Sequence, residues 1–228
     1  MYIPKHYRED DWEQAEYLIK TYPLGTLITT DSTGGIIANH IPFYLTKTAE
    51  GNHKLIAHVA KSNHQIPSLT ANSNVLIVFQ SVNSYITPDY YPGKQETHKY
   101  VPTWNFASVH LHGSSKIVDD VDFVRNQLDH LTEQEESVQK KDGRKQWKVS
   151  DAPENYVKIL QKAITGLEIS IDSFECKYKF DQAMRKADVD GTIEGLAQDG
   201  KVEISQLAKE TNARADAKKA EKKAQEAS

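Results

Sequence analysis

The sequence predicts a mainly β fold, a barrel or a sandwich, with helices at its flanks. Residues 25–118 hold about six short runs rich in β-branched and aromatic residues, separated by turn-forming residues at the short spacing typical of such folds. Apolar residues at helical spacing precede and follow this region. With 228 residues, of which 38% are hydrophobic, the chain is long enough to bury a substantial core in one large or two small units.

Two helices are predicted from spacing and capping. Between residues 12 and 22 the apolar side chains fall on one helical face, and Asp11 stands where an N-cap belongs. A second, short helix is predicted over residues 62–71, with Ser62 or Asn63 as its cap. Both helices border β-rich runs.

The β region opens with a predicted antiparallel hairpin. Residues 25–30 form its first strand, the Gly-containing stretch 31–35 its turn, and residues 36–45 the returning strand. Further strands are predicted at 54–60, 74–80, 84–87 and 106–118.

After residue 118 the pattern changes to helices and then to two alternating runs. Helical spacing recurs over 121–131 and over 153–164, the latter behind an Asp151 cap. Residues 167–171 and 174–180 each alternate apolar and polar, but the parity of the apolar positions switches between them. A register change of one residue predicts a bulge or a tight turn there.

The C-terminal region is rich in Ala, Lys and Glu and offers hardly any apolar face. We therefore expect residues 1–197 to form the folded domain and residues 198–228 a polar helical or disordered tail. Ile204–Asn212 resembles the first helix of a helix-turn-helix motif, but the polar run after it lacks the apolar anchors of a recognition helix. DNA is thus an open partner that no clear motif supports.

Charge and cysteine content exclude several classes of protein. A formal net charge of −4 gives no global basic field for nucleic acid or anionic lipid. The single cysteine, Cys176, allows no internal disulfide. The sequence also shows no secretory signal and no apolar run long enough to cross a bilayer. We expect a cytoplasmic protein without membrane association.

No familiar catalytic signature is present, neither a phosphate loop, nor a paired-histidine zinc helix, nor a nucleophile elbow. Cys176 falls on an apolar strand face and is interpreted as a small buried hydrophobe. His110 and His112 share a strand face, but two ligands make a weak metal signal, and we expect no metal. His98 and His112 are the only acid–base candidates, and only because they fall near the expected pocket.

Two segments could carry chemistry. Residues 85–112 combine six aromatic residues with three prolines, which favours a ligand pocket or a subunit interface over a free loop; a loop packed on its own barrel is the alternative. Residues 58–64 place a cation, a hydroxyl and amides between a strand and a helix. Such a junction can hold a phosphate through Lys61 and Ser62, although a simple polar turn with a helix cap explains it too.

Several ordered motifs carry a family resemblance. They are Met1-Tyr-Ile-Pro4, Gly25-Thr-Leu-Ile-Thr29, His40-Ile-Pro-Phe43, His58-Val-Ala-Lys-Ser-Asn63, Tyr85-Ile-Thr-Pro88, Tyr91-Pro-Gly-Lys94 and Val101-Pro-Thr-Trp-Asn105. Over residues 1–197 the chain resembles the PaiB family of FMN-binding negative transcriptional regulators. The resemblance implies a six-stranded antiparallel split β-barrel like that of pyridoxamine-phosphate oxidase, which dimerises with FMN held between the subunits.

The resemblance also implies a set of cofactor-binding residues. They are His58, Val59, Ala60, Lys61, Ser62, Asn63, Gln80, Trp104 and Asn105. In this reading the segment 58–63 contacts the phosphate and the ring edge, with Lys61 as counter-ion, while Trp104 and Asn105 wall the isoalloxazine. The Gln-Asn-Arg found near the end of family members is replaced here by Gln182-Ala-Met-Arg185.

The implied function is that of an FMN-binding homodimeric regulatory protein. The alternative is a flavin-dependent oxidoreductase that passes electrons from reduced FMN to a small substrate. The sequence names no catalytic residue for that alternative.

Overall fold

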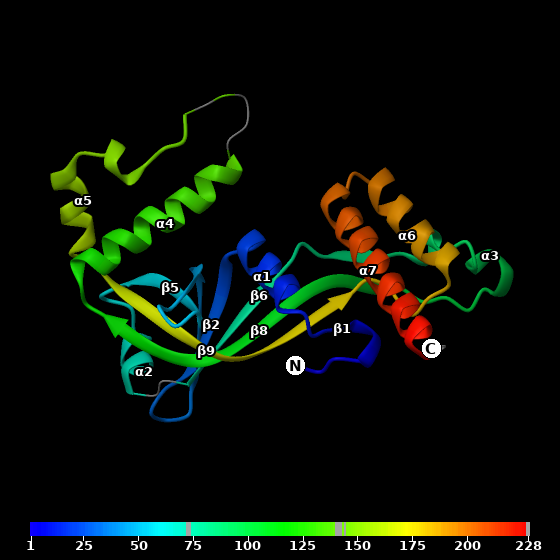
Figure 1. Cartoon of the computed structure of the whole chain (residues 1–228), viewed down its shortest axis with the longest axis horizontal. Coiled ribbons are helices and arrows are strands. Elements are labelled where there is room, and N and C mark those ends of the chain that lie inside the picture. Colours follow the sequence, from blue (N-terminus) through cyan, green and yellow to red (C-terminus); the bar gives the residue numbers. More distant parts are fainter. Residues whose placement is uncertain (72–73, 140–142, 144, 227–228) are drawn as a thin grey trace. The chain divides into compact units, whose positions relative to one another are not determined.

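The computed structural model is mainly β, with helices flanking an antiparallel sheet (Figure 1). It describes residues 1–71, 74–139, 143 and 145–226. Contacts divide the chain into unit 1, residues 1–12, 80–108 and 176–228, and unit 2, residues 13–79 and 109–175. Each unit is described by itself below.

Nine strands form the sheet in the described part of the chain. They are β1 Arg8–Glu9, β2 Leu24–Thr30, β3 Ile36–Pro42, β4 Tyr44–Lys47, β5 His53–Ala60, β6 Asn74–Gln80, β7 Ser84–Ile86, β8 Thr103–Val118 and β9 Ile164–Lys179. The strand order is β3-β2-β6-β8-β9-β5-β4, while β1 pairs with β9 and β7 with β8. The mainly β class with flanking helices is confirmed.

The predicted number of six strands is wrong. One reason is that the returning strand expected over 36–45 is interrupted at Phe43. Its first part, β3, pairs with β2, from Leu24 opposite Pro42 to Thr30 opposite Ile36, whereas its second part, β4, pairs with β5. The alternation of apolar residues continues across the break, so the sequence pattern does not reveal the change of partner.

The helices are α1 Trp12–Thr21, α2 Ile66–Ala71, α3 Lys94–Thr97, α4 Val121–Gln139, α5 Glu154–Gln161, α6 Lys186–Gln198 and α7 Val202–Glu226, with single 3₁₀ turns η1 Lys5–Tyr7, η2 Pro88–Tyr90 and η3 Val149–Asp151. The helices predicted at 12–22, 62–71, 121–131 and 153–164 are confirmed with shifted ends. The predicted Asp151 cap of α5 is wrong: this carboxylate accepts the Lys148 N–H at 3.1 Å, and Pro153 holds the N-cap position.

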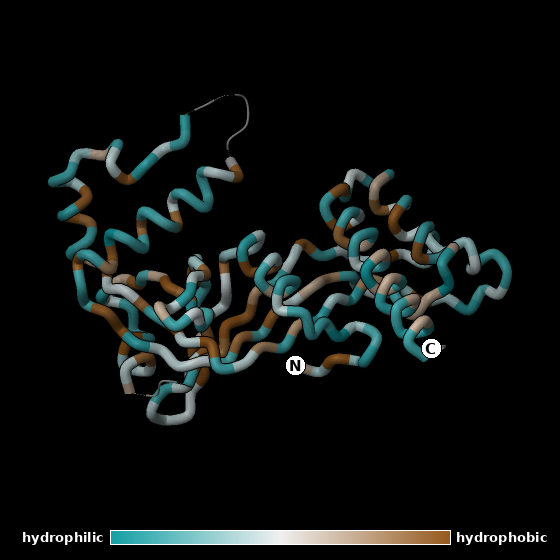
Figure 2. The backbone as a smooth tube through the Cα atoms, in the orientation of Figure 1, coloured by the Kyte–Doolittle hydropathy of each residue, from teal (hydrophilic) through white to brown (hydrophobic). Residues whose placement is uncertain are grey.

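The core of unit 2 lies where β2, β5 and β6 bring apolar side chains together. Leu27, Leu55 and Ile77 are fully buried, and the rings of Phe43 and Phe79 meet edge to face with their centroids 5.8 Å apart. Figure 2 shows hydrophobic residues concentrated in the strands and a mostly hydrophilic α4. In β2 a Cβ on Gly25 would lie 2.7 Å from Phe79 Cε1, so only glycine fits against that ring.

The parity switch predicted near residue 172 is present within β9. Leu167 and Ile169 are buried in unit 2, whereas Cys176 and Tyr178 are buried in unit 1. The tight turn offered as one explanation is wrong, because β9 continues without a break from Ile164 to Lys179. The switch therefore marks the point at which one strand leaves one core and enters another.

In unit 1, α6 and α7 pack against each other and bury Leu196, Ile204 and Leu207. The segment Ile204–Asn212 belongs to the helix α7, which is uninterrupted to Glu226, so no second helix of a helix-turn-helix follows it in the described residues. The expected division into 1–197 and 198–228 stays a prediction, because the two units group residues by contact and do not test it. Within the described ranges, no helix combines the length and the apolar character needed to cross a membrane.

Candidate functional site

The segment between β5 and α2 is fixed by local hydrogen bonds. The N–H of Lys61 donates to the carbonyl of Ala163 at 2.8 Å, which ties the segment to the residue before β9. Asn63 Oδ1 accepts the N–H of Gln65 at 2.9 Å, so Asn63 is the cap at the start of α2. Lys61 and Ser62 are left exposed on this anchored turn.

Gln65 positions this turn, and the sequence reading missed it. Its side chain is fully buried, and Nε2 donates to Thr29 Oγ1 at 3.0 Å and to the carbonyl of Leu27 at 3.3 Å. Oε1 accepts from Asn39 Nδ2 at 2.9 Å. The start of α2 is therefore tied to β2 and β3. A single glutamine inside a polar stretch gives no sequence signal of burial.

His58 and Val59 differ in what they can present to a ligand. His58 is half-buried in β5, with Nδ1 2.7 Å from Gln127 Oε1 of α4. Gln127 is fully buried, and its Nε2 has no hydrogen-bond partner among the described residues. The side chain of Val59 lies in the core, so only its backbone could contact a cofactor, and that backbone pairs with Thr165. Ala60, the last residue of β5, is exposed.

A cavity of about 330 Å³ lies beside Lys61 in unit 2. Its lining includes three lysines, two aspartates and one glutamine: Lys61, Lys158, Lys162, Asp119, Asp120 and Gln161. Lys61 Nζ lies 2.7 Å from Asp119 Oδ1, but the Asp119 side chain is 72% exposed, so this ion pair contributes little and can exchange.

Gln161 gives this cavity an unused donor. The residue is 8% exposed, and its Nε2 has no acceptor in the part of the chain that the structure describes. A buried N–H without an acceptor is costly, so an acceptor from a ligand would be stabilised here. Lysines and a free amide donor are groups that bind phosphate. The sequence reading missed the α5 residues because they lie far from Lys61 along the chain.

In unit 1, Trp104 and Asn105 lie at the paired start of β8. Asn105 is opposite Ser84 and Trp104 opposite Tyr85, and the rings of Trp104 and Tyr85 meet edge to face. Trp104 is 52% exposed, whereas Asn105 is fully buried. Asn105 Nδ2 donates to Asp181 Oδ2 at 2.9 Å, and Asn105 Oδ1 has no partner among the residues described.

Asp181 beside Asn105 is a buried acid with an unusual backbone. Its φ of 62° is in the left-handed region, where residues other than Gly, Asn and Asp are rarely found. Burial raises the pKa of the Asp181 carboxyl, although the hydrogen bond from Asn105 and the charge of Lys179 oppose that rise. Lys179 Nζ itself donates to Thr103 Oγ1 at 2.5 Å and to the carbonyl of Trp104.

Of the remaining candidates, Gln182 and Arg185 are held by contacts within unit 1, whereas Gln80 is exposed. Gln80 ends β6 and is exposed. Gln182 bonds to its own turn, accepting the Phe180 N–H and donating to the Tyr178 carbonyl. Arg185 forms ion pairs with Glu96 at 2.8 Å and Asp188 at 3.0 Å in unit 1.

Burial raises the pKa of the Cys176 thiol to about 12, which agrees with the interpretation of this residue as a buried hydrophobe. His112 Nε2 lies 3.3 Å from Glu175 Oε2. Across the described ranges, no group of three or more His, Cys, Asp or Glu side chains is placed to hold a metal ion.

The structure thus gathers the predicted residues into two groups. One surrounds Lys61 in unit 2, and the other surrounds Asn105 in unit 1. Each group holds a buried polar atom that has no partner within the described chain, Gln161 Nε2 beside the first and Asn105 Oδ1 in the second. Each is suited to bind part of a ligand.

Comparisons with known proteins show the family to which the chain belongs. The family model described as "Putative FMN-binding domain" matches residues 1–173. An uncharacterised protein of Saccharomyces cerevisiae is 43% identical over 155 residues, which cover 60% of this chain and 90% of that protein. The protease synthase and sporulation protein PAI 2 of Bacillus subtilis is 28% identical over 212 residues, covering 91% of this chain and 95% of that protein.

Among solved structures, a conserved hypothetical protein of Mycobacterium tuberculosis is similar with a TM-score of 0.55. The match covers 81% of this chain and 94% of that one at 10% identity, which shows a likeness of fold alone. The family match, in contrast, spans well over half of the 228 residues and contains all nine candidate cofactor-binding residues. The resemblance seen in the sequence is confirmed: the chain belongs to the FMN-binding domain family, and its cofactor is FMN.

Proposed function

We propose that the protein is a homodimeric regulatory protein that binds FMN with the phosphate beside Lys61 and the isoalloxazine beside Trp104 and Asn105. The observation that carries this proposal is the cavity at Lys61, where lysines surround a buried amide donor that has no acceptor in the described chain. The family match gives the cofactor, and the cavity suggests where its charged end binds.

The lining of the cavity fits a phosphate monoester. Such a group carries about 1.5 to 2 negative charges at neutral pH, which Lys61, Lys158 and Lys162 would balance. The phosphate would replace the exposed Asp119 as the partner of Lys61, and Gln161 Nε2 would gain the acceptor that it lacks. The exposed Ser62 hydroxyl is next to Lys61 and adds a further donor.

The residues around Asn105 fit the ring of a flavin. Asn105 Oδ1 is a buried acceptor that would receive the ring N–H of the isoalloxazine. Trp104 and Tyr85, both close to half-exposed, offer aromatic surface on which the ring could lie. When bound, FMN supplies redox chemistry that side chains lack, while the protein supplies binding and electrostatics.

The homodimer is proposed because the two groups of residues belong to different units, and a pair of subunits can supply the phosphate contacts from one chain and the ring contacts from the other. Trp104, Tyr85 and Val101 are exposed large hydrophobic residues of unit 1 that such an interface would cover. The name of the Bacillus subtilis relative, which refers to protease synthesis and sporulation, supports a regulatory role.

The phosphate assignment is tested by titrating apoprotein with FMN and following flavin fluorescence. Lys61→Ala removes one charge-assisted contact, worth about 1.5 to 3 kcal/mol, so the Kd for FMN should rise about 10- to 150-fold. Lys116→Ala removes a lysine that is exposed in unit 2 and lies outside the cavity, and it should leave the Kd unchanged. Equal Kd values for the Lys61→Ala variant and the natural protein would move the phosphate elsewhere.

A flavin-dependent oxidoreductase is the second candidate, and the buried Asp181 is the observation that favours it. An acid with a raised pKa beside a ligand-facing residue is a frequent feature of catalytic sites. The two functions are separated by adding NADH or NADPH to the FMN-loaded protein without oxygen. Loss of the visible flavin bands with either donor supports the enzyme, whereas unchanged bands with both support the regulatory protein.

A further inference from the structure

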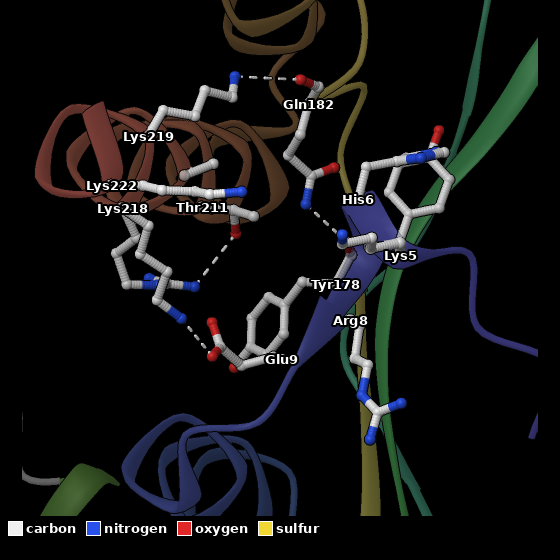
Figure 3. A pocket seen from close by; sticks show the side chains of 13 residues that line it. Lys5, His6, Arg8, Glu9, Tyr178, Gln182, Thr211, Lys218, Lys219 and Lys222 are labelled. Atoms are coloured by element: carbon white, nitrogen blue, oxygen red, sulfur yellow. Dashed lines mark hydrogen bonds and ion pairs between the residues drawn. The ribbon is translucent and has the colours of Figure 1, made fainter. Parts of the chain in front are cut away.

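A second and larger cavity, of about 500 Å³, lies within unit 1 (Figure 3). Its wall consists of the N-terminal segment Lys5–Glu9, Tyr178 and Gln182 at and after the end of β9, and the face of α7 from Thr211 to Lys222. Only the N-terminal segment falls within residues 1–173, which the FMN-binding family model matches. None of the nine candidate flavin-binding residues lines this cavity, although Tyr7 in its wall lies near Lys179, which bonds to Thr103 and to the carbonyl of Trp104.

The charge of this lining is strongly unbalanced. Six lysine and arginine side chains stand against one carboxylate, that of Glu9, which is buried and paired with Lys218 at 2.5 Å. In Figure 3 the lysines of α7 lie on one side, Lys5 and His6 on the other, and Arg8 points away from α7. Such an excess of cations in a concave site attracts anions of high charge.

Arg214 supplies the most specific feature. Its guanidinium stacks over the ring of Tyr178, with Cζ 5.1 Å from the ring centroid, and Nη2 donates to Thr211 Oγ1 at 3.3 Å. Nε is buried and has no acceptor in the described part of the chain. An arginine fixed against an aromatic ring with an unused buried N–H is prepared to bind an oxyanion.

The lysines nearby are available to the same ligand. Lys219 and Lys222 form ion pairs with the exposed residues Asp216 and Glu226, at 3.2 and 3.6 Å, and pairs of this kind contribute little to stability. Lys5 has no carboxylate within ion-pair distance among the described residues. An anion held by Lys5, Lys219 and Lys222 would therefore displace only weak interactions.

We propose that this cavity binds an organic phosphate of nucleotide size that carries two or more negative charges. The volume is within the range of small-molecule sites and exceeds what an inorganic ion fills. Arg214 holds one phosphate, the lysines of α7 and Lys5 hold the rest of the charge, and the half-buried Tyr7 offers a ring to the organic part. The formal net charge of the chain, −4, favours a small free nucleotide over the extended backbone of a nucleic acid.

Binding is measured by calorimetry and by the shift in Tm of the full chain saturated with FMN, with pyrophosphate, ATP and a short DNA duplex as probes. We expect pyrophosphate and ATP to bind and to raise the Tm. Arg214→Gln keeps a polar side chain but removes the charge, and it should weaken ATP binding about tenfold or more. Because Arg214 also packs on Tyr178, the Tm of the variant without ligand shows whether it folds.

Two neighbouring lysines of α7 give a matched pair that does not touch Tyr178. Lys222 lines the cavity and Lys223 does not, so Lys222→Glu and Lys223→Glu change the net charge equally. We expect Lys222→Glu to weaken ATP binding about tenfold and Lys223→Glu to leave it nearly unchanged.

The inference is overturned if neither ATP nor pyrophosphate binds, if both glutamate variants weaken binding equally, or if DNA binds and ATP does not compete with it. If FMN itself fails to bind, the same titrations without FMN still test this cavity, so the two proposals can fail separately. Unchanged FMN affinity in Arg214→Gln is the expected sign that the two sites are distinct.

Discussion

Asp181 combines burial, a left-handed backbone and a hydrogen bond from Asn105 in one residue. Its raised pKa means that the folded protein holds this proton more tightly than the unfolded chain does. The stability that the protonated acid contributes is therefore complete below the unfolded pKa, about 3.9, and is lost as the pH rises through the folded value. The cost of the αL backbone is the same at every pH.

Asp181→Asn should remove this loss, because asparagine imitates the protonated acid in size and polarity and tolerates the same backbone. We expect the variant to gain stability over the natural protein as the pH rises from 4 to 7. Urea unfolding at a series of pH values measures the difference. A difference in unfolding free energy that stays constant over this interval would show that Asp181 is charged throughout.

At the scale of elements, α6 depends on a close approach to the turn at Tyr90. A Cβ on Gly195 would lie 2.2 Å from Tyr90 Cδ1, although the residue is in the middle of a helix. Alanine would improve helix propensity by about 1 kcal/mol, but overpacking costs about 1–3 kcal/mol. The cost of the clash should therefore exceed the gain in helix propensity, and the substitution should destabilise the protein.

Gly195→Ala is expected to lower the free energy of unfolding by about 1–2 kcal/mol, measured by urea denaturation. Glu194→Ala, an exposed neighbour on the same helix, is the control and should be nearly neutral. A more stable Gly195→Ala variant would mean that α6 does not pack on Tyr90 as described.

The elements also show what the sequence can reveal. The helices and most strands follow from local periodicity, and even the parity switch in β9 was visible in the alternation of apolar residues. The break at Phe43 was not visible in the sequence, because it arises from the different partners of β3 and β4. The burial of Gln65 and Asp181 could not be predicted from the sequence either, because it results from tertiary contacts.

In the candidate site, too, the residues in local motifs could be predicted and those that depend on tertiary contacts could not. Short motifs single out the turn around Lys61 and the start of β8, and in the structure Lys61 and Ser62 are exposed on an anchored turn. The contribution of α5 could not be predicted, because Lys158 and Gln161 reach the cavity only through the fold. Motifs locate residues that are neighbours in sequence, whereas a cavity collects residues from distant segments.

At the scale of the whole molecule, the strands β8 and β9 run through both compact units, and the two candidate groups of site residues belong one to each. In the function proposed above, the phosphate lies beside Lys61 and the isoalloxazine beside Asn105, and these two residues belong to different units. We therefore expect FMN binding to be a property of the assembly and not of a single pocket.

The visible absorption spectrum tests that claim most directly. Protein is purified without added cofactor, incubated with FMN, desalted and measured, with Lys61→Ala as the matched variant. We expect the natural protein to retain flavin bands close to one FMN per chain, and Lys61→Ala to retain far less. A featureless spectrum from the natural protein after incubation would contradict this expectation.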